Sequence, residues 1–390
     1  MRAVVCGAGI AGLALAGCLG RQGWDVEVLE RAPGPRAQGY MMDFFGPGWD
    51  AAEAMGVLGA IREAGYAVSR LSYVDGRGRE RAGLPYARFA HALDGRLTSV
   101  LRPDLERVLR EHADPVAALR FGRAVVDVVA RPGGAGVVLD DGTLLDADLV
   151  VGADGVHSAV RRAALGPEER FRRFLGCHTA AFLLDDPEVR RDVGGRVCLT
   201  DDTDRTVGLY GLRDGRVAAF AVHRVDDPAL PADPRTALWR AHSSFGWLVP
   251  RVLQACPEDV YYDEVLQVEV PRWSRGRVVL LGDAAQAVSL LGGQGASIGV
   301  AGAWLLAERL ARAASVEEAL AGWERVWRPV VAEKQRAARD GAAWFLPASR
   351  SRVRARRLML RLAGLPGLDR AVTRGLVGRA RGDVRALAAG

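Results

Sequence analysis

Three glycines, Gly7-x-Gly9-x-x-Gly12, follow the first apolar run of this 390-residue chain without a break, and they constrain its fold more than any other feature. Residues 2–6 are typical of a buried strand, residues 13–22 of a helix with leucines four apart, and residues 26–30 of a second strand. Without side chains, the glycines allow a tight turn and let an anion reach the first N–H groups of the helix. The pattern predicts a βαβ unit in a parallel sheet that is covered on both faces.

An acidic residue, Glu30, lies 18 residues after Gly12, at the end of the second predicted strand. A carboxylate at that place can accept hydrogen bonds from ribose hydroxyls, so the motif predicts a dinucleotide site. Glu30 would repel a 2′-phosphate, which disfavours NADP, and the motif by itself does not choose between NAD and FAD. A glycine turn without a ligand, and Glu30 as an ordinary surface acid, are the alternatives.

The remaining pattern predicts an α/β protein with two domains and C-terminal helices. Helices are expected over 103–111 and 234–253 and again up to about residue 310, and strands over 124–129, 136–139, 148–152, 179–184, 205–212, 217–225 and 277–281, with a hairpin turn at 213–216. The first domain is Rossmann-like, on a parallel sheet, and a second, sheet-based domain is inserted into it. We assign residues 1–70, 95–169 and 271–340 to the first domain, 71–94 and 170–270 to the second, and 341–390 to a C-terminal helical segment.

The charge of the chain is concentrated at its end. The net charge is +6, but the last fifty residues contain eleven arginines and two aspartates, so the other 340 residues carry −3. With no aromatic residues interleaved, this basicity does not predict nucleic-acid binding. For the arginine-rich stretch 350–361 we favour a helix that packs Leu358, Leu360 and Leu362 on the body with its arginines in water. The alternative is a basic amphipathic helix on an acidic membrane surface.

The cysteines and the apolar segments bear on location and on metals. Five scattered cysteines without a CxxC pair predict neither a metal site nor a disulfide framework, and they suit the reducing cytoplasm. The first residues lack the flanks of a signal peptide. Residues 287–307 carry no charge, but polar residues and glycines interrupt them, so we expect a buried loop and helix and no integral membrane segment.

Three further motifs follow the opening one along the chain. They are Arg102-Pro103-Asp104-Leu105, then Asp154-Gly155 after the strand at 148–152, then Gly282-Asp283-Ala-Ala with Gly292-Gly293-Gln294-Gly295. In this order and spacing, over residues 1–310, the four motifs resemble those of the class A FAD monooxygenases, the para-hydroxybenzoate hydroxylase-like family. The Gly-Asp-Ala-Ala and Gly-Gln-Gly forms are most similar to the tetracycline-modifying and polyketide-tailoring branch.

The resemblance implies a role for each matching residue. Gly7, Gly9, Ala11 and Gly12 would pass the FAD pyrophosphate, Glu30 would hold the adenosine ribose, and Arg31 would lie by the adenine. Arg102 would lie along the ribityl and pyrophosphate groups, and Asp283 would bond a ribityl hydroxyl. Gly293, Gln294, Gly295 and Ala296 would direct backbone N–H groups at the pyrimidine edge of the flavin. Asp154 would brace Arg102 and take part in nicotinamide binding, and Arg36 would lie near the flavin.

The resemblance also implies the reaction. FAD would be reduced by NADPH or NADH, bound only transiently because the chain has one dinucleotide motif, and would react with O₂ to a flavin C4a-hydroperoxide. This species would hydroxylate or oxidise an aromatic or polyketide-like small molecule, as in antibiotic biosynthesis, and no acid–base residue of the protein is expected to be catalytic. The alternative is a flavoprotein of the same fold that uses FAD without redox turnover, as a cyclase scaffold or a drug-sequestering module.

Substrate contacts are expected from two places. Met42 and Phe44 follow the second strand and are candidates for the cavity wall, although core packing is the favoured interpretation of that stretch. Tyr210 and Phe220 lie on strands of the second domain. The chain departs from the family at two positions, with Gln286 in place of a histidine and Leu290 where a proline is usual, which affects the expected substrate-side geometry.

Overall fold

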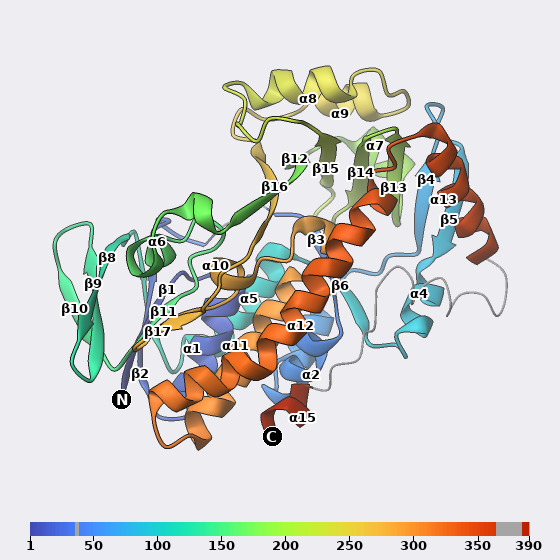
Figure 1. The fold of residues 1–390 in the computed structure, drawn as a ribbon. Helices are drawn as coiled ribbons and strands as arrows, with labels where there is room; N and C mark the ends of the chain where they lie inside the picture. The colour runs from blue at the N-terminus through green and yellow to red at the C-terminus, as the bar shows by residue number, and fades with distance from the viewer. Residues whose placement is uncertain (36–38, 364–383, 390) are drawn as a thin grey trace.

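The computed structural model describes residues 1–35, 39–363 and 384–389, and Arg36 therefore lies outside the described residues. These residues form two large sheets with helices packed on them, and the long helix α12 (Val316–Phe345) extends from one sheet to the other (Figure 1). The α/β class expected from the sequence is confirmed.

The first sheet contains the opening motif. Its strands, in spatial order, are β17 (Ser274–Arg275), β18 (Val278–Leu280), β11 (Leu149–Gly152), β1 (Arg2–Cys6), β2 (Asp25–Glu30) and β7 (Ala118–Phe121). Every neighbouring pair except β17–β18 is parallel. Ala3, Val4 and Val5 are fully buried, as expected of a strand that is covered on both faces.

Helices and a small antiparallel sheet cover this first sheet. The helices α1 (Ile10–Arg21), α5 (Arg102–Ala113) and α11 (Gly295–Arg312) pack together, with α2 (Pro47–Ala54) and α3 (Leu58–Glu63) beyond them. The small sheet consists of β8 (Val125–Arg131), β9 (Gly134–Leu139) and β10 (Leu144–Ala147), and it packs against β1, β11 and the short helix α6 (Ala159–Leu165).

The second large sheet is mostly antiparallel. Its strands, in spatial order, are β16 (Tyr261–Val268), β12 (Arg172–Leu184), β15 (Val217–Arg224), β14 (Arg205–Gly211), β13 (Arg196–Asp202), β4 (Arg70–Val74) and β5 (Glu80–Pro85). The parallel pair β13–β4 brings residues 70–85 into this sheet. The predicted hairpin turn at 213–216 joins β14 to β15. A separate two-stranded ribbon, β3 (Met41–Phe45) with β6 (Leu97–Leu101), lies between the sheets (Figure 1).

The two faces of the second sheet have different neighbours. Along β15, Val217, Ala219 and Ala221 pack with residues of α7 (Pro187–Val193), α8 (Pro234–His242) and α9 (Val249–Gln254). Ala218, Phe220 and Val222 belong to clusters on the other face. This alternation is the ordinary consequence of the two-residue period of a strand. The second face is the one that lies toward the first sheet and its helices (Figure 1).

The single helix predicted over 234–253 is wrong, because two helices, α8 and α9, occupy that range. The break lies at Gly246 and Trp247. A methyl group on Gly246 would lie 2.4 Å from the carbonyl oxygen of Gly76, and Trp247 has a positive φ of 56° while its N–H donates to the same oxygen. The close contact with the β4–β5 turn, a tertiary feature, therefore interrupts the helical periodicity.

The C-terminal helix α13 (Arg350–Ala363) packs along β5, but not through the predicted face. Leu360 is buried, whereas Leu358 and Leu362 are exposed and Arg356 is buried in their place. The final described helix is α15 (Val384–Ala389), which packs against α11 and α2. None of the helices within the described ranges combines the length and apolar character that crossing a membrane requires.

Candidate active site

The loop between β1 and α1 is built so closely that two of its glycines are obligatory. A methyl group on Gly12 would lie 2.0 Å from the carbonyl oxygen of Gly7. One on Gly7, whose φ is +110°, would lie 2.4 Å from the carbonyl oxygen of Ala153. Gly9 differs, since its nearest neighbour would be a carboxylate oxygen of Glu106 at 3.8 Å. The loop is therefore packed on its inner side and open at Gly9.

The N-terminus of α1 has no side-chain cap and no acid in its first turn. Its first N–H groups and its positive dipole end therefore lack an anionic partner within the helix. Glu30, at the end of β2, accepts hydrogen bonds from the N–H groups of Ala8 and Ala32, each at 3.0 Å. The carboxylate thus holds the glycine loop against the end of β2, and the exposed Arg31 is the next residue in the chain.

The second glycine-rich segment meets this loop at Ala11. A methyl group on Gly282 would lie 2.7 Å from the Cβ of Ala11, and one on Gly299 would lie 3.4 Å from it. Gly282 has a φ of +62° and precedes Asp283, the first residue of the short helix α10 (Asp283–Gln286). The structure therefore brings the opening motif against the Gly282-Asp283 turn and the first turns of α11. Almost 300 residues of the chain separate the opening motif from α11.

Asp283 is accessible to solvent although protein surrounds its carboxylate. Its side chain is exposed, and yet desolvation by the surrounding protein raises its carboxyl pKa, while the charge of Arg102 acts to lower it. Arg102, at the start of α5, forms an ion pair with Glu106 at 2.6 Å. Tyr40, whose hydroxyl pKa is raised by burial, is affected by the charges of both Arg102 and Asp283. These three side chains are therefore neighbours.

The loop before α11 faces open space. A methyl group on Gly293, which has a left-handed φ of +60°, would meet no atom within 4 Å. Gln294 is buried and precedes α11, whose N-terminus has no side-chain cap and no acidic residue in its first turn. A methyl group on Gly295 would lie 3.9 Å from a carboxylate oxygen of Asp283. A second uncapped helix N-terminus, with the half-buried Ala296, therefore borders this space.

The expected contact between Asp154 and Arg102 is not the one formed. The carboxylate of Asp154 accepts hydrogen bonds from the Ser158 hydroxyl and from the Val160 N–H at 3.1 Å, so it organises the start of α6. Burial raises the pKa of this carboxyl. Gly155, with a φ of +83°, borders open space. The local hydrogen bonds explain the difference, because two donors from its own loop occupy the carboxylate.

Phe220, on β15, is the centre of an apolar region between the second sheet and the loop before α11. It is half-buried and packs with three separate hydrophobic clusters. Those clusters also hold half-buried residues from other segments, among them Met41, Leu183, Val197, Leu290, Leu291, Trp344 and Phe345. An apolar lining that stays partly accessible, next to Gly293, is suited to an apolar ligand.

Two of the four expected substrate residues do not face this region, whereas Tyr210 belongs to the same cluster as Phe220. Met42 and Phe44 share one face of β3, which packs on the main core, and Phe44 is fully buried there. Their neighbour Met41 takes the other face, toward Phe220. Tyr210 is buried, and its hydroxyl accepts a hydrogen bond from the Met41 N–H. The core interpretation holds for Phe44, and strand alternation turns Met41, from the same predicted stretch, toward Phe220 in place of Met42.

The two departures from the family pattern have different surroundings. Gln286 is buried and directed at α11, with its amide nitrogen 3.4 Å from where a methyl group on Gly302 would lie. Leu290, in the 3₁₀ turn Leu290–Gly292, belongs to the cluster that contains Phe220. Leu290 therefore lies in the apolar region around Phe220, whereas Gln286 lies against α11.

Asp263 and Tyr261, on β16, lie near Tyr40 and Arg102, and no sequence motif indicated them. Tyr261 is exposed, and its hydroxyl donates to Asp263 at 3.2 Å. Desolvation by the surrounding protein nevertheless raises the pKa of the Tyr261 hydroxyl. The charge of Asp263 also raises this pKa, and the charge of Arg102 lowers it. In the parts of the chain that the structure describes, no cluster of three or more His, Cys, Asp or Glu residues is arranged to hold a metal ion.

Comparison with known proteins agrees with this geometry. The family model of the FAD binding domain matches residues 1–333. The chain is 31% identical over 374 residues to the FAD-dependent monooxygenase asL6 of Sarocladium schorii, which covers 88% of each chain. It is also 31% identical over 366 residues to the 3-amino-4-hydroxybenzoate 2-monooxygenase of Streptomyces cremeus, again over 88% of each.

Among solved structures, the tetracycline destructase Tet(55) superposes with a TM-score of 0.81 over 96% of both chains at 24% identity, so the two proteins share a fold. The match to the FAD binding domain and the identity to the two monooxygenases extend over most of the chain, as the resemblance of the four motifs implied. This chain therefore belongs to the family of FAD-dependent monooxygenases.

Proposed function

We propose that this chain uses FAD, NADPH or NADH, and O₂ to hydroxylate or oxidise an aromatic or polyketide-like small molecule. The observation that carries the proposal is a juxtaposition. The uncapped N-terminus of α11 lies beside Asp283 and has open space at Gly293, and the uncapped helix α1 meets the same segments at Ala11. The loop before α11 also adjoins the apolar region around Phe220. A dinucleotide with a flat ring system at one end and an apolar substrate beside that ring fits this arrangement.

The residues of the first motif fit the phosphate end of FAD. A side chain at Gly7 or Gly12 would overlap backbone oxygens, and the opening at Gly9 leaves room for a pyrophosphate against the N-terminus of α1. Glu30 already accepts two backbone N–H groups, and each of its oxygens keeps a second lone pair for a ribose hydroxyl. The exposed Arg31 is positioned next to it for the adenine.

The residues of the later motifs fit the flavin end. Asp283 and Arg102 are neighbours of opposite charge, and they would hold the ribityl and pyrophosphate oxygens. The N-terminus of α11, at Gly293–Ala296, would place backbone N–H groups against the pyrimidine edge. Negative charge on a reduced flavin is favoured there by the helix dipole.

Bound FAD supplies the redox chemistry and the oxygen transfer when NAD(P)H and O₂ are present. The protein's part is to orient the reactants and to exclude water from the apolar region lined by Met41, Phe220 and Leu290. Because the S. cremeus relative acts, by its name, on an amino-hydroxybenzoate, an electron-rich aromatic ring is the first substrate class to test. Tailoring of antibiotic-like molecules is the corresponding biological setting.

Further parts of the proposal rest on the sequence. Gly155 borders open space just before α6, and Asp154 precedes it, so we place the transient nicotinamide contact there. The role of Arg36 beside the flavin stays a prediction. A cytoplasmic location is also a prediction. The domain assignment is another, with residues 1–70, 95–169 and 271–340 in the FAD-binding domain and residues 71–94 and 170–270 in the substrate domain.

The test is NADPH and NADH oxidation by the FAD-loaded protein with a panel of aromatic acids and aromatic polyketides. We expect flavin reduction that accelerates with one substrate class, followed by a product that carries one atom from ¹⁸O₂. The variant Phe220→Ala tests the apolar region, since it should raise KM for that substrate and leave FAD binding unchanged. Formation of a product without O₂ and NAD(P)H would instead favour the non-redox use of FAD, and failure of the protein to bind FAD would overturn the proposal.

A further inference from the structure

The C-terminal helix α13 exposes its apolar side chains and buries an arginine. Val353, Arg356 and Leu360 are buried, whereas Leu358, Met359 and Leu362 are 57%, 43% and 43% exposed. A helix that only needs to cover a protein core has the opposite arrangement, with its leucines inward and its arginines in water. The exposed residues Leu358, Met359 and Leu362 are called the α13 ridge below.

The inward arginine is held in place by a buried acid. The Arg356 guanidinium forms an ion pair with Asp201 on β13, whose side chain is fully buried, and Arg357 pairs with the same carboxylate at 2.8 Å. Arg356 also donates to the carbonyl oxygens of Trp344 and Phe345 at 2.7 and 2.9 Å and lies 4.6 Å from the centre of the Tyr73 ring. These contacts determine the rotation of the helix, so the ridge must face away from the sheet.

The α13 ridge has arginines on both sides. At about 100° per residue, Leu358, Met359 and Leu362 lie on the face opposite Val353 and Leu360, with Arg352 on one flank and Arg354 and Arg361 on the other. The sequence of α13 contains six arginines and no acidic residue. The exposed arginines, Arg350, Arg352, Arg354 and Arg361, form no ion pair with an acid among the residues that the structure describes.

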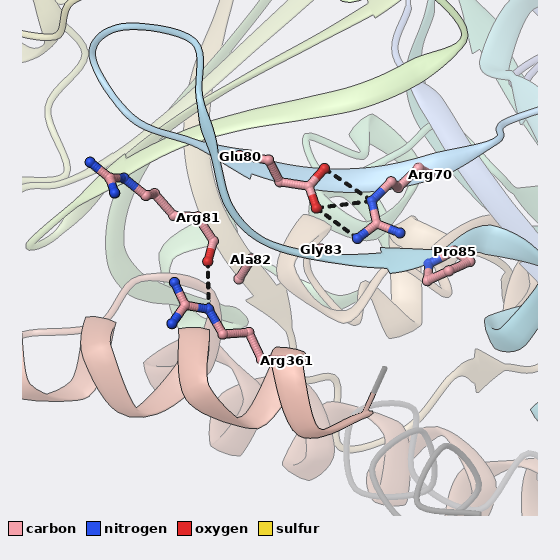
Figure 2. Close-up of a pocket in the computed structure, with 7 residues that line it drawn as sticks. All are labelled: Arg70, Glu80, Arg81, Ala82, Gly83, Pro85 and Arg361. Carbon is pink, nitrogen blue, oxygen red and sulfur yellow. Dashed lines mark hydrogen bonds and ion pairs between the residues drawn. The ribbon is translucent and has the colours of Figure 1, made fainter. Parts of the chain in front are cut away.

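An arginine-lined hollow lies beside the ridge. It has a volume of about 380 Å³, opens to the outside between β4–β5 and α13, and is lined by residues that include Arg70, Arg81 and Arg361 (Figure 2). Glu80 neutralises Arg70, and Arg361 donates its Nε–H to the carbonyl oxygen of Arg81 at 2.8 Å. No acid within the described ranges forms an ion pair with Arg361. Asp75 likewise pairs with Arg81 at 2.6 Å, so the positive charge that borders the hollow is that of Arg361, on the flank of the ridge.

We propose that α13 is a docking surface for an anionic phospholipid bilayer. The α13 ridge would enter the boundary between headgroups and acyl chains, and the flanking arginines would pair with lipid phosphates, as in helices that lie in the plane of a membrane. A second copy of this chain is a poorer occupant. A symmetric contact between two α13 helices would place uncompensated arginines against arginines. The inference does not depend on the flavin chemistry, because neither the ridge nor the hollow belongs to that site.

The experiment is co-sedimentation of the FAD-loaded full chain with vesicles of phosphatidylcholine, with and without phosphatidylglycerol. We compare the wild-type protein with Leu358→Ser/Met359→Ser/Leu362→Ser. The matched control is Leu144→Ser/Leu230→Ser, which alters two leucines that are 44% and 48% exposed elsewhere on the surface. All five substituted residues are solvent-exposed, and circular dichroism together with the FAD content verifies that each variant is folded.

We expect the wild-type protein and the control to bind the anionic vesicles, more weakly as salt increases, and the ridge variant to bind roughly tenfold less well or worse. Three results would overturn the proposal. The first is a wild-type protein that stays in the supernatant with anionic vesicles. The second is a folded ridge variant that pellets like the wild type, which would mean that charge alone attracts the vesicles. The third is dimerisation in solution that requires the ridge, without vesicle binding.

Discussion

At the scale of single residues, the candidate site depends on backbone atoms that approach where a side chain would otherwise lie. Gly7 and Gly12 each leave room for a carbonyl oxygen at 2.0–2.4 Å from a missing methyl group, and Gly9 leaves room for something outside the protein. Asp283 adds a carboxylate whose pKa is raised by desolvation where the opening motif meets the Gly282-Asp283 turn. Two predictions follow from these residues.

Gly12→Ala should abolish FAD binding. The new methyl group would lie 2.0 Å from the Gly7 carbonyl oxygen, so the glycine loop must move away from the helix that would hold the pyrophosphate. Titration of the apoprotein with FAD, followed by flavin fluorescence, measures the effect. Gly59→Ala is the matched control, since a methyl group there meets no atom within 4 Å and the position lies in the short helix α3. Normal FAD affinity in Gly12→Ala would contradict the close-packed loop.

Asp283→Asn should weaken FAD binding by about 10- to 100-fold, the worth of a hydrogen bond to a charged group. The amide keeps the size of the side chain and removes the charge that faces Arg102. The same titration measures the loss, with Asp214→Asn in the exposed β14–β15 turn as control. An unchanged affinity would show that Asp283 serves only to begin α10.

At the scale of elements, α13 is the clearest case of a tertiary contact that overrides a helical pattern. The apolar residues of 350–363 favour burial of Leu358, Leu360 and Leu362, but Asp201 on β13 is buried and requires a cation. Leaving a carboxylate unpaired in the interior costs more than exposing three apolar side chains to water. The helix is therefore rotated so that Arg356 and Arg357 face the sheet.

Arg356→Met should lower the free energy of unfolding by about 3 kcal/mol, since Arg357 alone would then neutralise Asp201 and the carbonyl groups of Trp344 and Phe345 would lose their donor. Urea denaturation measures the change. Arg354→Met, on the exposed side of the same helix, should change it by less than about 0.5 kcal/mol. Adding Asp201→Leu to Arg356→Met should recover part of the loss. Equal effects of Arg356→Met and Arg354→Met would contradict the buried ion pair.

At the scale of the whole molecule, a buried chain of histidines couples global stability to pH. His178 Nδ1 and His223 Nε2 each lie 3.2 Å from the Tyr262 hydroxyl, and His223 Nδ1 lies 3.3 Å from His242 Nε2, between the second sheet and α8. Desolvation, and then the charge of His178, lowers the pKa of His223 to about 4. Desolvation, with the charges of His223 and Arg205, lowers the pKa of His242 to about 3.

The folded protein should therefore lose stability as the pH falls below about 6.5, the ordinary pKa of histidine. Below that pH the unfolded chain takes up protons that His223 and His242 in the folded protein refuse until about pH 4 and 3. At pH 5 the loss is about 2 kcal/mol for each histidine. Urea denaturation at pH 7 and pH 5 measures it, and His242→Phe should reduce the difference. A stability that stays constant between these pH values would contradict the lowered pKa values.

How much the sequence could predict depended on the range of the interactions involved. The β1–α1–β2 unit was predictable because apolar periodicity and the glycines act within about thirty residues, and the same holds for the strand before Asp154 and for the turn at 213–216. The family motifs extended the prediction to Arg102, Asp283 and Gly293, although no local pattern relates these residues to one another. The structure adds that the opening glycine motif and the segment that begins at Gly282 meet at Ala11.

The sequence by itself thus indicated the α/β class, the dinucleotide turn and the membership in a flavoprotein family, because each depends on the spacing of residues within short segments. Only the tertiary structure decided which face of β3 lies toward Phe220, where the helix at 234–253 breaks, and which side of α13 faces outward. In each case the deciding partner is distant in the chain, namely the Tyr210 hydroxyl, the Gly76 carbonyl oxygen and the Asp201 carboxylate. A buried polar group must be satisfied wherever its partner lies, and that requirement overrides the local periodicity.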